Sequence, residues 1–297
     1  MIALITTPST SHAPFPAPAH PSIIGAIWHL PFRYSMLWSS RIRTITEKPM
    51  LTLWPVTGLP MIQPRDDVAA MAGEALRPLS PQDGDILVVT SKIVSKAEGR
   101  FVNLRDVTPS PEALALAAST QKDARLVQVI LGESSSVSRS APNLIITRHR
   151  LGFVSANAAI DHSNTASDPD IVLLMPRDPD ASAVMIQAHL RTSLGVAMPV
   201  IIADSHGRPH RMGTVGVAVG VAGMPGVEDW RGRPDLFGFQ LQHTEIGLAD
   251  MVASAATLVM GQAAEGVPAV LVRGVVFSGR DGNAAEINRP APMDLYQ

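Results

Sequence analysis

The sequence contains no cysteine, no long run of one charge and no long uninterrupted apolar segment. Without cysteine there is no disulfide framework, no thiolate nucleophile and no cysteine-based zinc site. No apolar run reaches the roughly 18 to 20 residues that a membrane-spanning helix needs. The formal net charge of −2 at pH 7 gives no sign of a nucleic-acid-binding surface. We therefore expect a cytoplasmic protein that binds neither nucleic acid nor a membrane.

Common nucleotide-binding and hydrolase motifs are also missing. The chain has no Gly-x-x-x-x-Gly-Lys-Ser/Thr loop, no Gly-x-Gly-x-x-Gly after its first predicted strand, no His-Glu-x-x-His and no Gly-x-Ser-x-Gly. A site in this protein must therefore be sought in other clusters of polar residues.

Aromatic residues make up only 4% of the chain, whereas hydrophobic residues make up 46% and charged residues 17%. This composition favours a soluble α/β protein with an aliphatic core. Residues 1–49 differ from the rest, because they hold seven of the 25 prolines and a single acidic residue, Glu47. We predict a disordered extension over residues 1–49, one compact α/β domain over residues 50–280 and a flexible tail over residues 281–297.

Short apolar runs between turn residues predict the strands of the domain. They lie at residues 52–56, 86–90, 144–147, 171–174, 200–203 and 268–273. Gly216, Gly220 and Gly223 recur within a Val-rich run, which indicates close approach of backbones inside a sheet rather than a helix.

Capping residues predict the helices. Asp66 or Asp67 caps a helix that reaches about Leu76. A second helical segment runs from Ser110 to about Leu131, as one helix or a broken pair. A third begins at a cap at Asp180 and continues through Leu194, with a stop at Gly195. Residues 241–260 form the longest helical candidate.

The densest polar cluster follows the predicted strand at residues 200–203. It contains Asp204, Ser205, Arg208 and Arg211. Ligands of α/β proteins bind at the carboxyl ends of strands, and a carboxylate beside a hydroxyl suits magnesium or manganese. The two arginines could hold phosphate or carboxylate groups. The alternative is a capped turn, in which Asp204 and Ser205 bond only backbone amides.

A second carboxylate, Asp161, also follows an apolar segment and stands shortly before Asn164. Two aspartates from separate strand ends commonly hold a magnesium ion that also binds substrate phosphates. Lys92 and Lys96 follow the strand at residues 86–90 and could supply the positive charge for phosphate. The alternative is that these lysines are solvated surface charges and the aspartates are caps. The histidines in these clusters lack zinc-ligand spacing, so we disfavour a zinc site.

Five blocks of residues, in order along the chain, resemble the coenzyme F420-0:L-glutamate ligase (F420:gamma-glutamyl ligase) family. The resemblance covers about residues 52–280, and its most distinctive block is Ser-Lys-x-x-Ser-Lys-Ala-Glu-Gly. The blocks lie at residues 56–60, 89–99, 157–164, 204–208 and 260–274.

The resemblance implies a mixed α/β fold of the family's own type, with a mixed sheet, assembled as an intertwined homodimer. It also implies a GTP-dependent ligase of coenzyme F420 biosynthesis. The enzyme would join L-glutamate to the lactyl carboxylate of coenzyme F420-0, add further gamma-linked glutamates, and release GDP and phosphate.

The resemblance also assigns roles to single residues. Asp161 and Asp204 would hold one divalent metal ion, magnesium or manganese, and Ser205 would help to hold a second. Potassium is a further candidate cation. The residues expected to contact GTP are Leu59, Pro60, Met61, Ile62, Ser91, Lys92, Lys96 and Asn164.

One position departs from the family pattern. Gln262 stands where the family can carry a glutamate as a further metal ligand. A neutral amide attracts a cation less strongly than a carboxylate does. Either the second metal is bound more weakly here, or Glu265 or another acid takes over this role.

The expected mechanism follows from the chemistry of amide formation. The substrate carboxylate would attack the gamma-phosphate of GTP to give an acyl phosphate, with two cations and Lys96 neutralising the phosphoryl charge. Arg208 or Arg211 would grip the carboxylate of the incoming glutamate or the substrate phosphodiester. Two alternatives stay open at this point. One is another metal-dependent acid–amine ligase or a phosphotransferase, and the other is a non-catalytic nucleotide-binding module.

Overall fold

The computed structural model describes residues 50–294, which belong to one compact unit of the chain. The predicted extension over residues 1–49 and the last three residues of the predicted tail lie outside this range. The helices and strands are β1 (Thr52–Pro55), α1 (Val68–Leu76), β2 (Ile86–Thr90), α2 (Ser91–Ala97), β3 (Phe101–Asn103), α3 (Pro111–Thr120), α4 (Ala124–Gly132), β4 (Ser134–Ala141), β5 (Leu144–His149), β6 (Val154–Ala156), β7 (Ile171–Leu173), α5 (Pro179–Leu194), β8 (Val200–Arg208), β9 (Arg211–Ala222), β10 (Glu228–Asp229), β11 (Glu245–Ile246), α6 (Leu248–Met260) and β12 (Ala269–Arg273). Among the helices of residues 50–294, none has the length and apolar character needed to cross a membrane.

Five strands form a mixed sheet in the order β1-β12-β2-β8-β9. β2 and β8 run parallel, with Thr90 paired to Ala203, and the other neighbouring strands of this sheet run antiparallel. The predicted α/β class and mixed sheet are therefore confirmed. Each of the predicted strand segments overlaps an observed strand, and these strands are β1, β2, β5, β7, β8 and β12.

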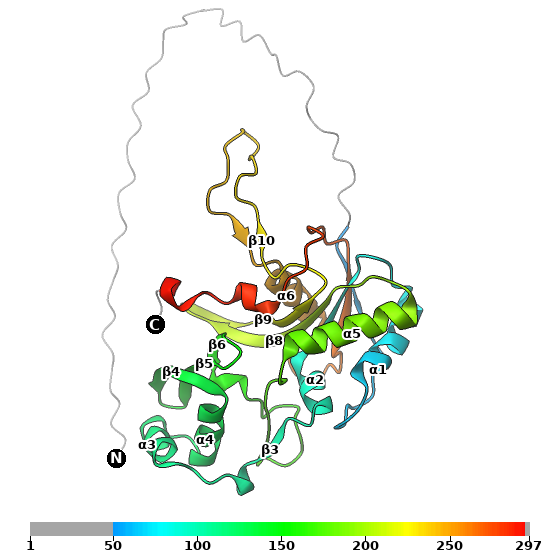
Figure 1. Ribbon diagram of the computed structural model, residues 1–297. Coiled ribbons are helices and arrows are strands. Elements are labelled where there is room, and N and C mark those ends of the chain that lie inside the picture. Colours follow the sequence, from blue (N-terminus) through cyan, green and yellow to red (C-terminus); the bar gives the residue numbers. More distant parts are fainter. Residues whose placement is uncertain (1–49, 295–297) are drawn as a thin grey trace, which may run out of the picture. The chain divides into compact units, whose positions relative to one another are not determined.

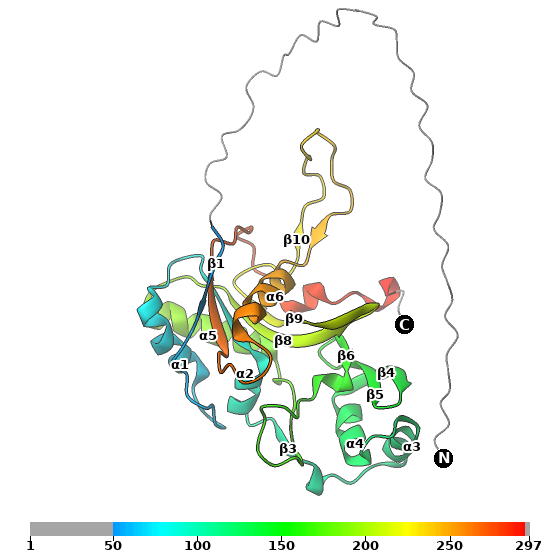
Figure 2. The ribbon, with the colours of Figure 1, turned by 180° about the vertical axis from the view of Figure 1, so that it is seen from behind.

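Helices cover both faces of this sheet (Figures 1 and 2). Alternate residues of β2 point to opposite faces, so Leu87 and Val89 pack with α1 and α5. Ile86 and Val88 pack with α6 on the other face. All four side chains are completely buried, which explains why this strand reads as a continuous apolar run.

Two glycines of β9 let these helices approach the sheet closely. A Cβ atom on Gly216 would lie 2.6 Å from the carbonyl oxygen of Ala253 in α6. A Cβ atom on Gly220 would lie 2.4 Å from the carbonyl oxygen of Pro179 at the start of α5. The predicted close approach of backbones at these glycines is confirmed.

A smaller lobe contains the antiparallel sheet β4-β5-β6 and the helices α3 and α4. Its core includes Ile130 and Ile145. Of the two predicted alternatives for residues 110–131, one helix or a broken pair, the structure has the pair, because Ser110 caps α3 and Gln121 ends it in a left-handed conformation. β4 was not predicted, since its serine-rich sequence is largely exposed and lacks apolar alternation.

The predicted start of α5 is wrong by two residues. Asp178, and not Asp180, caps this helix by accepting the N–H of Ala181. Asp180 lies in the first turn, where its carboxylate instead accepts the N–H groups of Val221 and Ala284. Asp180 therefore ties the helix to the edge of the sheet.

The predicted helix over residues 241–260 is wrong in its first part, because α6 begins at Leu248. Residues 230–244 instead form an arm that projects from the unit, with β10 and β11 paired at its base (Figure 1). Leu241 donates its N–H to the carbonyl of Arg233, so this segment returns along the arm and is not free to coil. α5, with 16 residues, is longer than α6, with 13.

The predicted end of the strand at residue 203 is also wrong, because β8 continues to Arg208. Beyond Ala203, pairing with β2 stops but pairing with β9 continues, from Asp204 opposite Val217 to Gly207 opposite Thr214. The polar cluster therefore lies in a hairpin and not in a loop. Asp204 is the first residue of β8 beyond the carboxyl end of β2.

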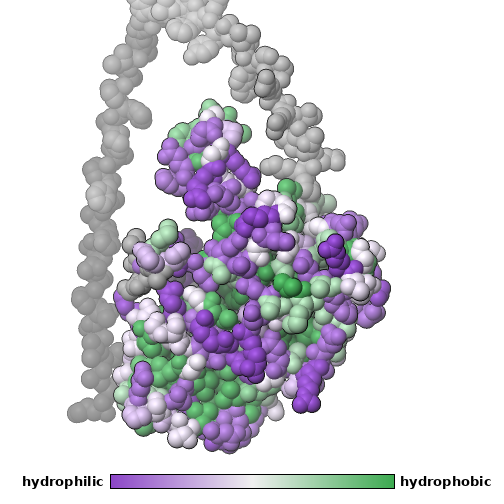
Figure 3. All heavy atoms as spheres, in the orientation of Figure 1, coloured by the Kyte–Doolittle hydropathy of each residue, from purple (hydrophilic) through white to green (hydrophobic). Residues whose placement is uncertain are grey.

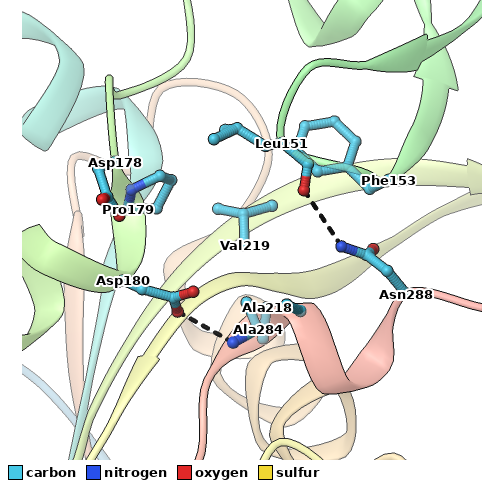
Figure 4. Close-up of a pocket in the computed structure, with 10 residues that line it drawn as sticks. Leu151, Phe153, Asp178, Pro179, Asp180, Ala218, Val219, Ala284 and Asn288 are labelled. Atoms are coloured by element: carbon cyan, nitrogen blue, oxygen red, sulfur yellow. Dashed lines mark hydrogen bonds between the residues drawn. The ribbon is translucent and has the colours of Figure 1, made fainter. Parts of the chain in front are cut away.

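The segment 281–294, expected to be a flexible tail, packs against the unit instead. Ala284 is buried and its N–H donates to Asp180, while Asn288 donates to the carbonyl of Leu151 at 3.2 Å (Figure 4). A small cavity of about 50 Å³ lies between these contacts. A backbone N–H and an amide side chain of this segment therefore bond α5 and the smaller lobe, partners that local sequence patterns do not indicate.

Candidate active site

A pocket of about 780 Å³ opens where β2 ends and α2 begins. Its lining comes from the loop before α1, the start of α2, the segment between β6 and β7, the middle of β8 and the loop between α6 and β12. This is the end at which the parallel strands β2 and β8 terminate their pairing, the usual place for a ligand site in such sheets. The pocket brings together all the predicted nucleotide and metal residues, Leu59, Pro60, Met61, Ile62, Ser91, Lys92, Lys96, Asn164, Asp161, Asp204, Ser205 and Gln262.

Asp204 is held from two sides. Ser91 Oγ donates to Asp204 Oδ1 at 3.0 Å, and His206 Nε2 lies 2.9 Å from Asp204 Oδ2. Burial opposes ionisation of Asp204, but the hydrogen bond and charge of His206 and the hydrogen bond from Ser91 hold its pKa below the ordinary value. These side-chain partners exclude the alternative in which Asp204 only caps a turn.

Asp161 faces Asp204 from the other wall. Its backbone pairs with Leu173 of β7, and its carboxylate lies 2.7 Å from the ammonium of Lys92. Burial and the nearby charge of Asp204 raise the pKa of Asp161, in spite of the ion pair with Lys92. Two partly buried carboxylates that repel each other form a favourable place for a divalent cation.

A left-handed turn delivers Asp161 to the pocket. Asn157, Ala158 and Ala159 all have positive φ angles, of 52°, 53° and 53°. Such a conformation costs roughly 1–2 kcal/mol per residue when the residue is not glycine. The turn is secured because Asn157 accepts the N–H of Ile145 and Ala158 is completely buried in the smaller lobe.

Lys96 lines the pocket, and the residue as a whole is only 8% exposed. Burial and the charge of Lys92 lower the pKa of Lys96. Within residues 50–294, its ammonium makes no hydrogen bond or ion pair. Lys92 and Lys96 are four residues apart on α2 and so lie on the same face of the helix. A phosphate between them would supply the missing partner.

The third side of the pocket carries neutral oxygen atoms. Ser205 Oγ donates to Gln262 Oε1 at 3.0 Å. Glu265, considered above as a substitute ligand, bonds its own loop, with Oε2 accepting the N–H of Ala263 at 2.8 Å. Asn164 donates to the carbonyl of Ala263 at 2.7 Å and so joins this loop to the segment after Asp161.

These residues fit one divalent cation better than two. Asp161 and Asp204 provide carboxylates, whereas Ser205 and Gln262 provide only neutral oxygens. In residues 50–294 no three histidines or acids cluster into a complete metal site. Magnesium commonly takes one or two carboxylates from the protein and completes its shell with phosphate and water, so two carboxylates are sufficient for the first ion.

Arg208 and Arg211 are not part of the pocket lining. They lie at the far end of the β8–β9 hairpin, where Arg208 donates to the carbonyl of Met212 at 3.2 Å. The expectation that one of them grips a substrate in this pocket finds no support within a single chain. The cause is the unpredicted length of β8, which carries Arg208 away from Asp204.

His206 is the site residue whose role the sequence interpretation missed. Residues two apart on a strand point to the same face, so His206 lies beside Asp204. Had residues 204–208 been taken as strand, this alternation would have identified the pair.

Comparison with known proteins gives a consistent result. A family model described as F420-0:Gamma-glutamyl ligase matches residues 58–274. A protein named Coenzyme F420:L-glutamate ligase from Methanothermobacter thermautotrophicus is 45% identical over 251 residues, which cover 83% of this chain and 99% of that protein. A protein of the same name from Methanopyrus kandleri is 46% identical over 227 residues, which cover 76% of this chain and 88% of that protein. Another from Archaeoglobus fulgidus is 40% identical over 245 residues, which cover 82% of this chain and 96% of that protein.

Proposed function

The chain belongs to the F420-0:gamma-glutamyl ligase family, and we propose that it joins L-glutamate to coenzyme F420-0 in coenzyme F420 biosynthesis. The first bond would be an amide to the lactyl carboxylate, and later glutamates would be gamma-linked. The observation that carries this proposal is the convergence of two carboxylates, Asp161 and Asp204, and two ammonium groups, Lys92 and Lys96, in one pocket of about 780 Å³.

GTP is the proposed source of energy. Its phosphates would lie against the face of α2 that carries Lys92 and Lys96, and Ser91 at the start of that helix would lie near them. Leu59 to Ile62 and Asn164 line the same pocket and would contact the rest of the nucleotide. The unpartnered ammonium of Lys96 supports this placement, since a phosphate in the pocket would give it a charge-assisted hydrogen bond.

Asp161 and Asp204 would hold a magnesium or manganese ion, which would neutralise phosphate charge and orient the reacting groups. Ser205 and Gln262 would help to hold a second cation, with potassium as a further candidate for this pocket. Because these two ligands are neutral, we expect the second cation to be held mainly by the phosphates of the nucleotide.

The proposed reaction has two steps. A carboxylate oxygen of F420-0 forms a bond to the gamma-phosphorus of GTP while the bond to the GDP oxygen breaks, which gives an acyl phosphate. The glutamate amine then bonds to the acyl carbon, phosphate leaves with the electron pair of the broken bond, and the nitrogen loses a proton. Lys96 would neutralise charge on the transferred phosphoryl group, and Lys92 would assist it.

A homodimer is also proposed, and the arm over residues 230–244 supports it. Leu236 and Phe237 at its tip are 99% and 95% exposed, and the arm stands clear of the rest of the unit in Figure 3. Asp235 orders the tip by accepting the N–H groups of Phe237 and Phe239. An ordered turn that presents large apolar side chains to water suits packing against a second copy. Light scattering of a Phe237→Asp variant should then show a smaller mass than that of the unchanged protein.

Mass spectrometry of F420-0 after incubation with the purified protein, L-glutamate, GTP and manganese tests the proposed reaction. We expect successive glutamyl additions that require GTP. Additions to other acids, with F420-0 unchanged, would identify a different acid–amine ligase. GTP turnover with phosphorylation of F420-0 or another acceptor and no amide would identify a phosphotransferase. Bound GTP without turnover would identify a nucleotide-binding module.

A further inference from the structure

The carboxylate of Asp204 depends on a second residue of its own strand. Asp204 and His206 lie on the same face of β8, and His206 Nε2 lies 2.9 Å from Asp204 Oδ2. An ionised carboxylate has no hydrogen to donate, so in this contact His206 is the donor and Asp204 the acceptor. Ser91 bonds the other oxygen at 3.0 Å, so the carboxylate plane is fixed from both ends.

Aromatic packing holds the ring of His206 in turn. Its centroid lies 5.0 Å from that of Phe153, with the rings tilted by 49°. Phe153 stacks on His149 at 4.7 Å and 9°, and both residues come from the smaller lobe. His149 is itself fixed, because its Nδ1 accepts the N–H of Leu151 at 3.0 Å. The three rings therefore form a rigid support between the smaller lobe and Asp204.

We propose that His206 is a positioning residue, which fixes the carboxylate of Asp204 in the orientation that a divalent cation shared with Asp161 requires. This inference rests on the proposed function, in which Asp204 is a metal ligand. The ring of Phe153 packs against the ring of His206 and restricts its orientation. The smaller lobe, which also buries Ala158 in the turn before Asp161, thereby helps to set the geometry of both carboxylates.

The closing experiment measures manganese binding directly, by electron paramagnetic resonance of the free ion, with the full-length protein and without nucleotide. His206→Leu removes the donor but keeps a side chain of similar size. Loss of a hydrogen bond to a metal ligand typically weakens metal binding by about 10-fold to 100-fold. We expect a loss in this range, and we expect the turnover rate to recover at saturating manganese.

Two further variants separate positioning from general stability. His206→Gln retains an N–H donor on a flexible chain and should restore part of the affinity. Phe153→Leu keeps the hydrogen bond but removes the ring contact, so its affinity should lie between those of His206→Leu and the unchanged protein. His162→Leu is the matched control, because His162 is exposed and follows Asp161 directly, yet it makes no hydrogen bond within residues 50–294.

The outcomes are distinct. Unchanged manganese affinity in His206→Leu would overturn the positioning role, as would an equal loss in the His162→Leu control. If the His206→Leu variant does not fold, as judged by circular dichroism, the order of affinities of His206→Gln and Phe153→Leu decides the question. Failure of the unchanged protein to bind manganese would contradict the proposed metal site itself and, with it, the premise of this role.

Discussion

The partly buried carboxylate of Glu133 should make the stability of the protein depend on pH in a defined way. Arg100 Nη2 and Arg150 Nε lie 2.9 Å and 3.2 Å from Glu133 Oε2, and the side chain of Glu133 is 13% exposed. Burial opposes ionisation, but His149, Arg100 and Arg150 together lower the pKa of Glu133 from 4.5 to about 2. The His149 distance of 3.6 Å is long for a hydrogen bond, so the two arginines are the firm contacts.

The size of the effect follows from these pKa values. Because the folded pKa lies below the unfolded one, ionised Glu133 stabilises the fold above pH 4.5, and this contribution is lost as the pH falls toward 2. The full contribution is roughly 3 kcal/mol, of which about 0.8 kcal/mol is lost at pH 4 and about 2 kcal/mol at pH 3.

Urea unfolding of the unchanged protein and of Glu133→Gln, followed by circular dichroism between pH 3 and pH 7, measures this contribution. At pH 7 the variant should be less stable by roughly 2–3 kcal/mol, since both arginines lose a charged partner. The difference between the two proteins should narrow as the pH falls. A difference that stays constant with pH, or equal stability at pH 7, would refute the reasoning.

Three further predictions concern the sheet and the pocket. Gly220→Val should destabilise the fold by about 1–3 kcal/mol or more in urea unfolding, because its Cβ would overlap the backbone of Pro179. The control Gly207→Ala, at a position with open space around it, should change the free energy of unfolding by less than about 0.5 kcal/mol. Lys96→Met should weaken GTP binding about 10-fold to 100-fold in calorimetry, since a hydrogen bond to a charged group contributes roughly 1.5–3 kcal/mol. Lys122→Met should leave GTP binding unchanged, because the Lys122 ammonium bonds the carbonyl of Asn143 in the smaller lobe. Gln262→Glu should tighten manganese binding in the presence of GTP by about fivefold or more, because it adds a charge beside Ser205, and an unchanged affinity would place the second cation elsewhere.

The elements that could be predicted from the sequence are those with a local cause. β2 was predicted with its observed bounds because a strand buried on both faces needs an unbroken apolar run. The start of α3 could be predicted because Ser110 and Pro111 satisfy its first turn without help from the rest of the chain.

The elements that were missed depend on distant partners. Residues 204–208 are polar and so indicate a loop, yet they form a strand because β9 supplies their hydrogen bonds. The segment 281–294 resembles a tail in composition, but its groups bond Asp180 and the carbonyl of Leu151, more than a hundred residues away. Local patterns carry no information about such contacts.

The same distinction between local causes and distant partners holds for the residues of the pocket. The residue types and their order predicted the pocket, because Lys96 follows β2, whose end could be located, and Asp161 and Asp204 each follow an apolar run. The placement of Arg208 could not be predicted once β8 was taken to end at Ala203. The partnership of His206 with Asp204 was missed for the same reason.

The most direct test of the central claim is mass spectrometry of F420-0 with L-glutamate, GTP and manganese, comparing the unchanged protein with Asp204→Asn. The unchanged protein should add glutamyl units only when GTP is present. The variant should add none while remaining folded, because the amide keeps the size of the side chain but removes the charge that holds the cation. Full glutamyl addition by folded Asp204→Asn would contradict the account.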